Sequence, residues 1–281
     1  MKIIIPSKQN CKKKNHAPNR RKKDMGISLE VETARFQSLV RAISINGLIE
    51  EPAIFLRQEY LKTVNRDIAS VIASCSIFQE KFFNGYHVEE GEERYIAVNA
   101  EKLLKLTKQL SDDTVEIKIE KDKMTIRTAQ QKIKVPLIEY NKGQAKLPHF
   151  LREEETGFVF TETYPVVVKI PKLGRELEGL GEKETFFSIN DSSLTVKQET
   201  VDGYLIEQKI SDVNVESSFS VVVDTSYLKG MFDSVICEEV ELRLDKTSPL
   251  AIIDKTSDYQ LVLGLALRVM EESTAEEEKN E

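Results

Sequence analysis

Most of the chain alternates apolar and polar residues with a period of two, which is typical of half-buried β-strands. The segments that follow this pattern are residues 29–31, 53–57, 60–64, 68–74, 115–119, 124–128, 133–138, 166–170, 186–189, 194–198, 204–210, 219–223, 240–244, 250–253 and 259–269. Turns rich in acidic residues, Asn or Asp join many of them, so we expect antiparallel meanders.

Four segments change to the spacing of an amphipathic helix. Residues 33–45 place apolar side chains at positions i, i+3, i+4 and i+7. Asn99 and Asp224 each precede a helical segment as an N-cap, because their side-chain oxygens can accept the free N–H groups of a first turn. A shorter helix is predicted over residues 171–180, with Pro171 in the first helical position.

The chain contains an internal repeat. Residues 98–103 align with 223–228 at an offset of about 125 residues, and residues 115–119 align with 240–244 at the same offset. Both copies read as strand, capped helix, acidic turn and strand. We therefore predict an α+β protein with two similar domains, each with antiparallel sheets and two helices on one face.

The predicted boundaries follow from this duplication and from composition. We assign residues 25–139 to the first domain, the polar stretch 140–163 to an interdomain connector, and residues 164–270 to the second domain. Residues 271–281 form an acidic tail.

The charge is distributed unevenly. Residues 1–24 contain nine Lys or Arg and one acid, so the overall charge of −7 leaves roughly −15 for the rest. We interpret this basic arm as disordered, since it has little apolar surface to bury. A nuclear-import signal or a nonspecific nucleic-acid arm is one reading. The alternative is a dispensable extension, since Met25 could itself be an initiator.

Composition excludes several classes. Charged residues make up 31% of the chain, and no apolar run approaches the ~20 residues of a membrane-spanning helix. Without a secretory signal, we expect an intracellular protein, nuclear if eukaryotic and cytoplasmic otherwise. The three cysteines and three histidines are scattered, so we expect neither a disulfide framework, nor a metal site, nor another cofactor.

Motifs of common enzymes are missing. The sequence has no GxxxxGK[ST] phosphate loop, no GxSxG nucleophile elbow and no HExxH pair. The acidic pairs Asp112-Asp113 and Glu238-Glu239 fall in predicted turns, where solvated charge is the ordinary reading. We therefore predict no catalytic residue and no enzymatic activity.

The outer faces of the four predicted helices share basic residues, although the body is acidic. Together they form a candidate phosphate-facing wall, since Lys and Arg bind the nucleic-acid backbone without reading bases. For any single helix, a solvated surface explains the charges equally well. The candidate DNA-facing residues are Arg35, Arg41, Lys102, Lys105, Lys108, Lys172, Arg175 and Lys229.

Several short matches occur in a characteristic order along residues 25–272. They are residues 135–138 (VPLI), 167–171 (VVKIP), 226–228 (SYL), 249–250 (PL) and 265–269 (LALRV), the last followed by the acidic tail. In this order, and with the duplication, the sequence resembles the sliding clamps of archaea and eukaryotes, the proliferating cell nuclear antigen (PCNA) family, as a divergent member.

The resemblance implies a ring of three chains with helices around a central hole that holds duplex DNA. It implies that the ring closes by pairing of strand edges between neighbouring chains. By position, the subunit-interface residues would be Lys132, Ile133, Val135, Leu137, Tyr204, Ile206, Lys209 and Ile210.

The resemblance also implies partners: DNA polymerase, a clamp loader, ligase and nuclease clients that dock through short peptides under the connector. The implied pocket residues are Val64, Ile68, Ala69, Leu147, Pro148, Pro249, Leu265, Ala266 and Leu267. Core packing is the competing interpretation of each. The acid-rich turn of the family is Val64-Asn65-Arg66-Asp67 here, and Leu267 replaces its usual proline, so the pocket shape departs from the family pattern.

The function expected from these observations is that of a DNA sliding clamp, which provides polymerase processivity in replication and repair. One alternative is a subunit of a heterotrimer or a clamp-like scaffold that does not encircle DNA by itself. The other is an unrelated duplicated α+β domain with a ligand-binding or enzymatic site.

Overall fold

The computed structural model describes residues 26–140, 146–154, 157–174, 177, 183–190, 192–199, 203, 205–215 and 218–268. The basic arm, the acidic tail, Tyr204 and Arg175 lie outside the described residues. Three α-helices occur within these ranges: α1 (Thr33–Ser44), α2 (Ala100–Thr107) and α3 (Thr225–Ser234), with a 3-10 turn η1 (Glu80–Phe82).

Strands make up most of the described chain. In the first half they are β1 (Ile27–Glu32), β2 (Ala53–Leu56), β3 (Tyr60–Arg66), β4 (Ile72–Gln79), β5 (Gly85–His87), β6 (Arg94–Ala97), β7 (Thr114–Ile119), β8 (Lys123–Arg127) and β9 (Lys132–Pro136). In the connector they are β10 (Leu151–Glu154) and β11 (Gly157–Phe160). In the second half they are β12 (Val166–Pro171), β13 (Glu184–Asn190), β14 (Ser193–Glu199), β15 (Leu205–Asp212), β16 (Phe219–Asp224), β17 (Glu239–Leu244), β18 (Leu250–Lys255) and β19 (Tyr259–Leu265).

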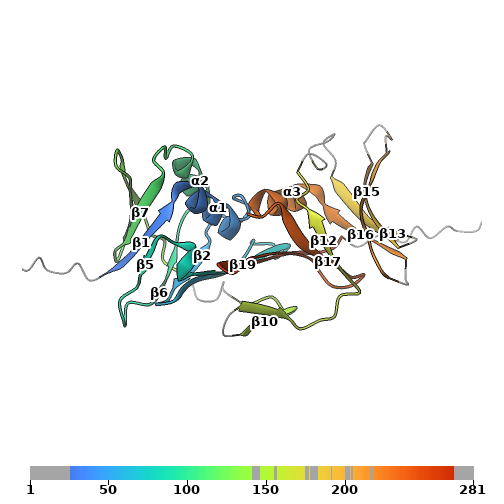
Figure 1. Ribbon diagram of the computed structural model, residues 1–281, viewed down its shortest axis with the longest axis horizontal. Helices are drawn as coiled ribbons and strands as arrows, with labels where there is room; N and C mark the ends of the chain where they lie inside the picture. Colours follow the sequence, from blue (N-terminus) through green and yellow to red (C-terminus); the bar gives the residue numbers. More distant parts are fainter. Residues whose placement is uncertain are drawn as a thin grey trace, which may run out of the picture.

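The strands form one large central sheet and two smaller end sheets. The central sheet has the order β12-β17-β18-β19-β4-β3-β2-β6, so the two halves of the chain join where β19 pairs with β4. One end sheet has the order β5-β1-β7-β8-β9 and the other β15-β14-β13-β16. These end sheets lie at opposite ends of an elongated molecule (Figure 1). All strand pairs are antiparallel, as the meander pattern predicted.

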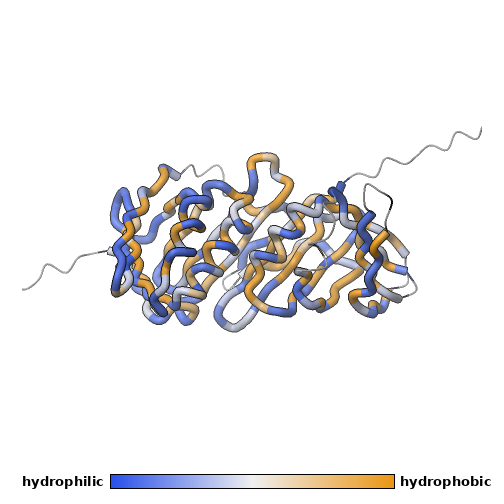
Figure 2. Tube along the Cα trace, turned by 90° about the horizontal axis from the view of Figure 1, so that it is seen from above, coloured by the Kyte–Doolittle hydropathy of each residue, from blue (hydrophilic) through white to orange (hydrophobic). Residues whose placement is uncertain are grey.

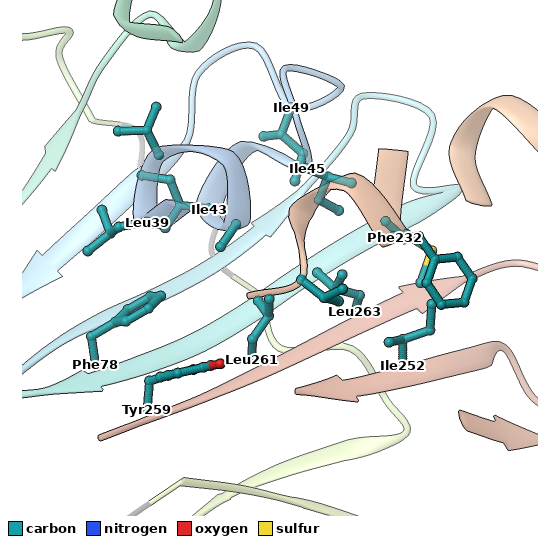
Figure 3. Packing of buried hydrophobic residues seen from close by; sticks show 14 of the residues in the cluster. Leu39, Ile43, Ile45, Ile49, Phe78, Phe232, Ile252, Tyr259, Leu261 and Leu263 are labelled. Carbon is teal, nitrogen blue, oxygen red and sulfur yellow. The ribbon is translucent and has the colours of Figure 1, made fainter. Parts of the chain in front are cut away.

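The helices cover one face of the central sheet, and the β10–β11 hairpin lies on the other (Figure 1). The main core fills the helix side. Leu39 of α1 lies above Phe78 of β4, and Phe232 of α3 lies above Ile252 of β18 (Figure 3); all four are buried. The alternation of hydrophobic and hydrophilic positions along the strands, visible in Figure 2, assigns alternate residues to this core and to the opposite face.

The predicted caps and the repeat are confirmed locally. The Asn99 side chain accepts a hydrogen bond from the Lys102 N–H at 2.9 Å, and Asp224 caps α3 in the same way through Ser226 and Tyr227. Both helices follow a strand (β6, β16) and lead into another (β7, β17), as the aligned segments predicted.

The predicted third helix is wrong at its start. Pro171 is the last residue of β12, where it pairs with Glu239. β12 is an edge of the central sheet, and an edge tolerates a residue without an N–H group. Most of the remaining predicted helix, residues 175–176 and 178–180, lies outside the described residues.

Two strand predictions also needed correction. Residues 68–71 were expected within a strand but form a turn, because the Asp67 carboxylate accepts the Ile72 N–H at 2.9 Å and Ser70 has a positive φ of 58°. The last strand ends at Leu265 instead of continuing to residue 269; beyond it, the Ala266 N–H bonds to Val71 and the Arg268 N–H to Val222. The sequence patterns did not predict β5 or the hairpin inside the connector.

Candidate functional site

The α2 lysines form the most exposed part of the predicted basic wall. Lys102, Lys105 and Lys108 are all exposed and follow one another at intervals of three, so they share one face of the helix. Lys105 bonds to Glu101 at 2.5 Å, and this hydrogen bond lowers the pKa of the Glu101 carboxyl. Lys102 and Lys108 therefore present the less compensated charges of this face.

The remaining predicted basic residues make more contacts with other groups of the same chain. Arg35 donates to the Phe82 carbonyl at 3.0 Å and lies 4.0 Å from the Asp258 carboxylate, with its guanidinium 5.5 Å from the Phe82 ring. These contacts tie α1 to η1 and to the β18–β19 turn. Lys172 donates its Nζ to the Val235 carbonyl at 3.0 Å. Arg41 and Lys229 are half-buried.

Within the described chain each end sheet has two edge strands, β5 and β9 in one and β15 and β16 in the other. β9 ends one end sheet and presents Lys132 and Lys134 as exposed side chains. β15 ends the other, with Leu205 61% and Ile206 41% exposed. Exposed apolar residues on an edge strand are typical of a surface that pairs with another chain.

The residues predicted to form one partner pocket are divided between three places. Val64 and Leu147 line a cavity of about 130 Å³ on the hairpin side of the central sheet, together with Ala53, Phe55, Lys62, Tyr95 and Glu153. Ile68, which is 96% exposed, and Ala69 line a separate open groove of about 670 Å³ beside Tyr227. Leu265 is fully buried in the main core, against which Leu267 packs.

The two predicted prolines lie near the hairpin. Pro148 is buried, and its carbonyl accepts the Leu151 N–H at 3.0 Å at the start of β10. The Pro249 carbonyl accepts the Tyr164 hydroxyl at 3.1 Å, which ties the end of the connector to β18. Ala266 is half-buried just beyond β19.

Sequence reasoning missed the aromatic residues on the hairpin side. Phe55 stacks on Tyr95 at 4.2 Å between ring centroids, and Tyr95 stacks on Tyr140 at 4.7 Å. Phe150, which is 4% exposed, packs against Gly264 of β19. A glycine inside a strand is a recognisable signal of close approach, and it could have been read at position 264.

Among the residues that the structure describes, no group of three or more His, Cys, Asp and Glu side chains could hold a metal ion. Nor does any helix of this part of the chain have the length and apolar character that crossing a membrane requires.

Comparison with protein-family models and with the sequences of curated proteins finds no match. Comparison with solved structures does. A structure described as the C-terminal region of FEN-1 bound to A. fulgidus PCNA matches 88% of this chain and 100% of that chain, with a TM-score of 0.70 and 16% identity. PCNA from Entamoeba histolytica matches 87% of this chain and 100% of that chain, with a TM-score of 0.71 and 12% identity. The chain therefore has the fold of the PCNA sliding clamps, as the sequence resemblance predicted.

Proposed function

We propose that this protein is a DNA sliding clamp whose chains join into a closed ring around duplex DNA. The proposal rests on one observation about strand pairing. At the centre of the chain β19 pairs with β4, and the corresponding strands at the two ends, β9 and β15, are edge strands without a partner on their outer side in the described chain. The clamp fold supports the same assignment.

The repeat makes this relationship explicit. The central sheet consists of β12-β17-β18-β19 from the second half followed by β4-β3-β2-β6 from the first. In the same positions of the other half, β1-β7-β8-β9 corresponds to the first group and β15-β14-β13-β16 to the second. Since β19 pairs with β4 inside the chain, β9 of one chain would pair with β15 of the next.

Such a joint is head-to-tail, since it uses two different surfaces of each chain. Head-to-tail contacts build either a ring or an open filament, depending on the rotation between chains. The resemblance favours a ring of three chains. The apolar Leu205 and Ile206 of β15 would be covered in this joint.

Duplex DNA would face the helices in this arrangement. The exposed lysines of α2 would contact phosphates without reading sequence, while the net charge of −7 would discourage DNA from other surfaces. A ring holds DNA by topology, so a small number of basic residues is sufficient. The proposed role is to hold replication and repair enzymes on DNA, without catalysis, inside the cell.

Clients would dock through short peptides. The FEN-1 region in the archaeal structure is the model for this contact, and polymerase, ligase and the clamp loader are the other proposed partners. The candidate surface is the hairpin side of the central sheet, where Val64 and Leu147 border a cavity.

A scaffold that does not encircle DNA by itself is the second candidate. It is favoured because Arg35, Lys105 and Lys172 bond to other groups of the same chain, which reduces the uncompensated charge on the helix side. A heterotrimeric ring would belong to this class if the present chain lacked the ability to pair with itself.

The testing experiment combines native mass with DNA retention. Light scattering after size exclusion, over a concentration series, should give a mass near three times 32.0 kDa. After loading, the protein should stay on closed circular DNA and slide off once the circle is linearised. A persistent monomer would contradict self-sufficient ring formation, and equal retention on both DNA forms would contradict encirclement.

A further inference from the structure

The connector hairpin is an independent element that lies on the main sheet. β10 and β11 pair only with each other among the described strands, as a separate two-stranded sheet of four residues per strand. A two-stranded hairpin of this length is marginal on its own, so packing against the central sheet must hold it in place.

Phe150, just before β10, is one of three buried apolar side chains of this segment, with Leu151 and Phe158, that pack on the central sheet. A Cβ atom built on Gly264 would lie 2.5 Å from the Phe150 Cζ atom, so the ring occupies the space that any side chain at position 264 would fill. Gly264 lies between the buried residues Leu263 and Leu265 of β19. The result is a notch in the sheet face that accepts one aromatic ring.

Few polar contacts hold the rest of the hairpin. The Gln260 side-chain amide accepts the Phe158 N–H at 2.8 Å and donates to the Phe158 carbonyl at 3.0 Å. Lys62 of β3 bonds to Glu153 of β10 at 2.7 Å. Glu153 is 44% exposed, so water competes for this ion pair.

The hairpin does not fill the face that it covers. The cavity of about 130 Å³ remains beside it, with Lys62 and Glu153 among its lining residues and Val64 and Leu147 on its walls. A segment that leaves a cavity beneath its edge forgoes part of the packing that a complementary partner would provide.

We propose that the β10–β11 hairpin is a cis occupant of the client surface, and that a client peptide binds by placing an aromatic side chain in the Gly264 notch in place of Phe150. This inference rests on the proposed function. The client must therefore displace the hairpin, and its affinity is reduced by the fraction of molecules in which Phe150 occupies the notch.

The experiment measures binding of a fluorescent peptide from the C-terminal region of FEN-1 to the full chain by anisotropy. Phe150→Ala empties the notch and should tighten binding about tenfold or more. Gly264→Ala should loosen the hairpin as much as Phe150→Ala does, but it puts a methyl group into the notch. The affinity of this variant for the peptide should therefore not rise. Glu153→Ala removes the ion pair without disturbing the core and should tighten binding by about two- to fivefold. It keeps the test valid if Phe150→Ala does not fold.

Hydrogen exchange gives the second readout. Addition of the peptide to the unmodified protein should increase exchange at the Phe158 amide, which is bonded to Gln260 in the closed state. Equal affinity for all variants, with unchanged exchange, would overturn the inference and leave the clamp proposal intact, since a client would then bind elsewhere. No binding to any variant would also overturn it. The mass and DNA-retention measurements then decide separately whether the chain is a clamp.

Discussion

Arg268 and Asp224 connect the end of the second half to the start of its helix. The Arg268 Nη2 atom lies 2.6 Å from the Asp224 Oδ2 atom, while the same carboxylate caps α3 through the Ser226 and Tyr227 N–H groups. The other Arg268 nitrogen, Nη1, lies 2.7 Å from Glu184 on β13. One guanidinium therefore joins the segment after β19 to the strand–helix junction at which the sequence repeat was recognised.

This relationship predicts an acid-sensitive contribution to stability. Burial opposes ionisation of Asp224, but the hydrogen bonds from Ser226, Arg268 and Tyr227 outweigh it and lower the pKa of the carboxyl. A carboxylate with a lowered folded pKa stabilises the fold above its unfolded pKa, and this stabilisation disappears as the pH falls through the folded pKa. Asp224→Ala should lower the free energy of unfolding by about 1 kcal/mol at pH 7, the usual value of an N-cap.

Urea denaturation between pH 7 and pH 2 measures this difference. The difference in the free energy of unfolding between the unmodified protein and Asp224→Ala should become smaller as the pH falls. Asn99→Ala, which removes the cap of α2 but no titratable group, is the matched control, and its difference from the unmodified protein should not narrow in this way. A gap of constant size over the whole pH range would contradict the assignment.

A second prediction concerns the buried carboxylate of Asp254. This fully buried side chain accepts the Ile236 and Cys237 N–H groups at 2.5 and 3.2 Å and the Tyr259 hydroxyl at 2.7 Å. Tyr259→Phe removes one donor to a buried charge and should cost about 1.5–3 kcal/mol in the free energy of unfolding. Tyr60→Phe loses only an exposed bond to Arg57 and should stay within about 0.5 kcal/mol, so similar losses for both would show that Asp254 does not depend on the hydroxyl.

The third prediction tests the helix surface. Reversing the charge of Lys102, Lys105 and Lys108 together should lower the amount of protein loaded onto circular DNA at least tenfold and flatten the salt dependence of loading, because phosphate contacts release counterions. The single change at Lys105 should matter least, since Glu101 already compensates its charge. The control reverses three exposed lysines on strands and turns, Lys169, Lys246 and Lys255. If this control lost as much loading as the α2 variant, the helices would not be the DNA-facing surface.

The fourth prediction tests the strand edges. The double substitution Leu205→Asp and Ile206→Asp places charge on a strand edge that would be covered in the ring. This variant should shift the native mass from that of a trimer toward 32.0 kDa. Val167 on β12 is the matched control. It is 52% exposed and also lies on a sheet edge, but on one that the proposed joint does not use. Val167→Asp should leave the mass unchanged, and equal dissociation by both variants would place the contact elsewhere.

Much of this molecule could be predicted from the sequence, because the relevant interactions are local. The period-two and helical spacings depend on neighbouring residues, and the caps at Asn99 and Asp224 bond within three residues of themselves. The repeat indicated that the two halves of the chain contain corresponding strands and helices. These local signals were sufficient for the α+β class, for α1, α2 and α3, and for most strands.

The tertiary structure decided what depends on residues distant in the chain. The partners of Arg35 lie on η1 and the β18–β19 turn, and no spacing rule connects them to α1. Pro171 pairs with Glu239 in an edge strand instead of opening a helix. The notch at Gly264 is filled by Phe150, which arrives there from a connector more than a hundred residues earlier. Periodicity reports which face of an element is apolar, whereas the identity of the group that covers that face is set by long-range packing.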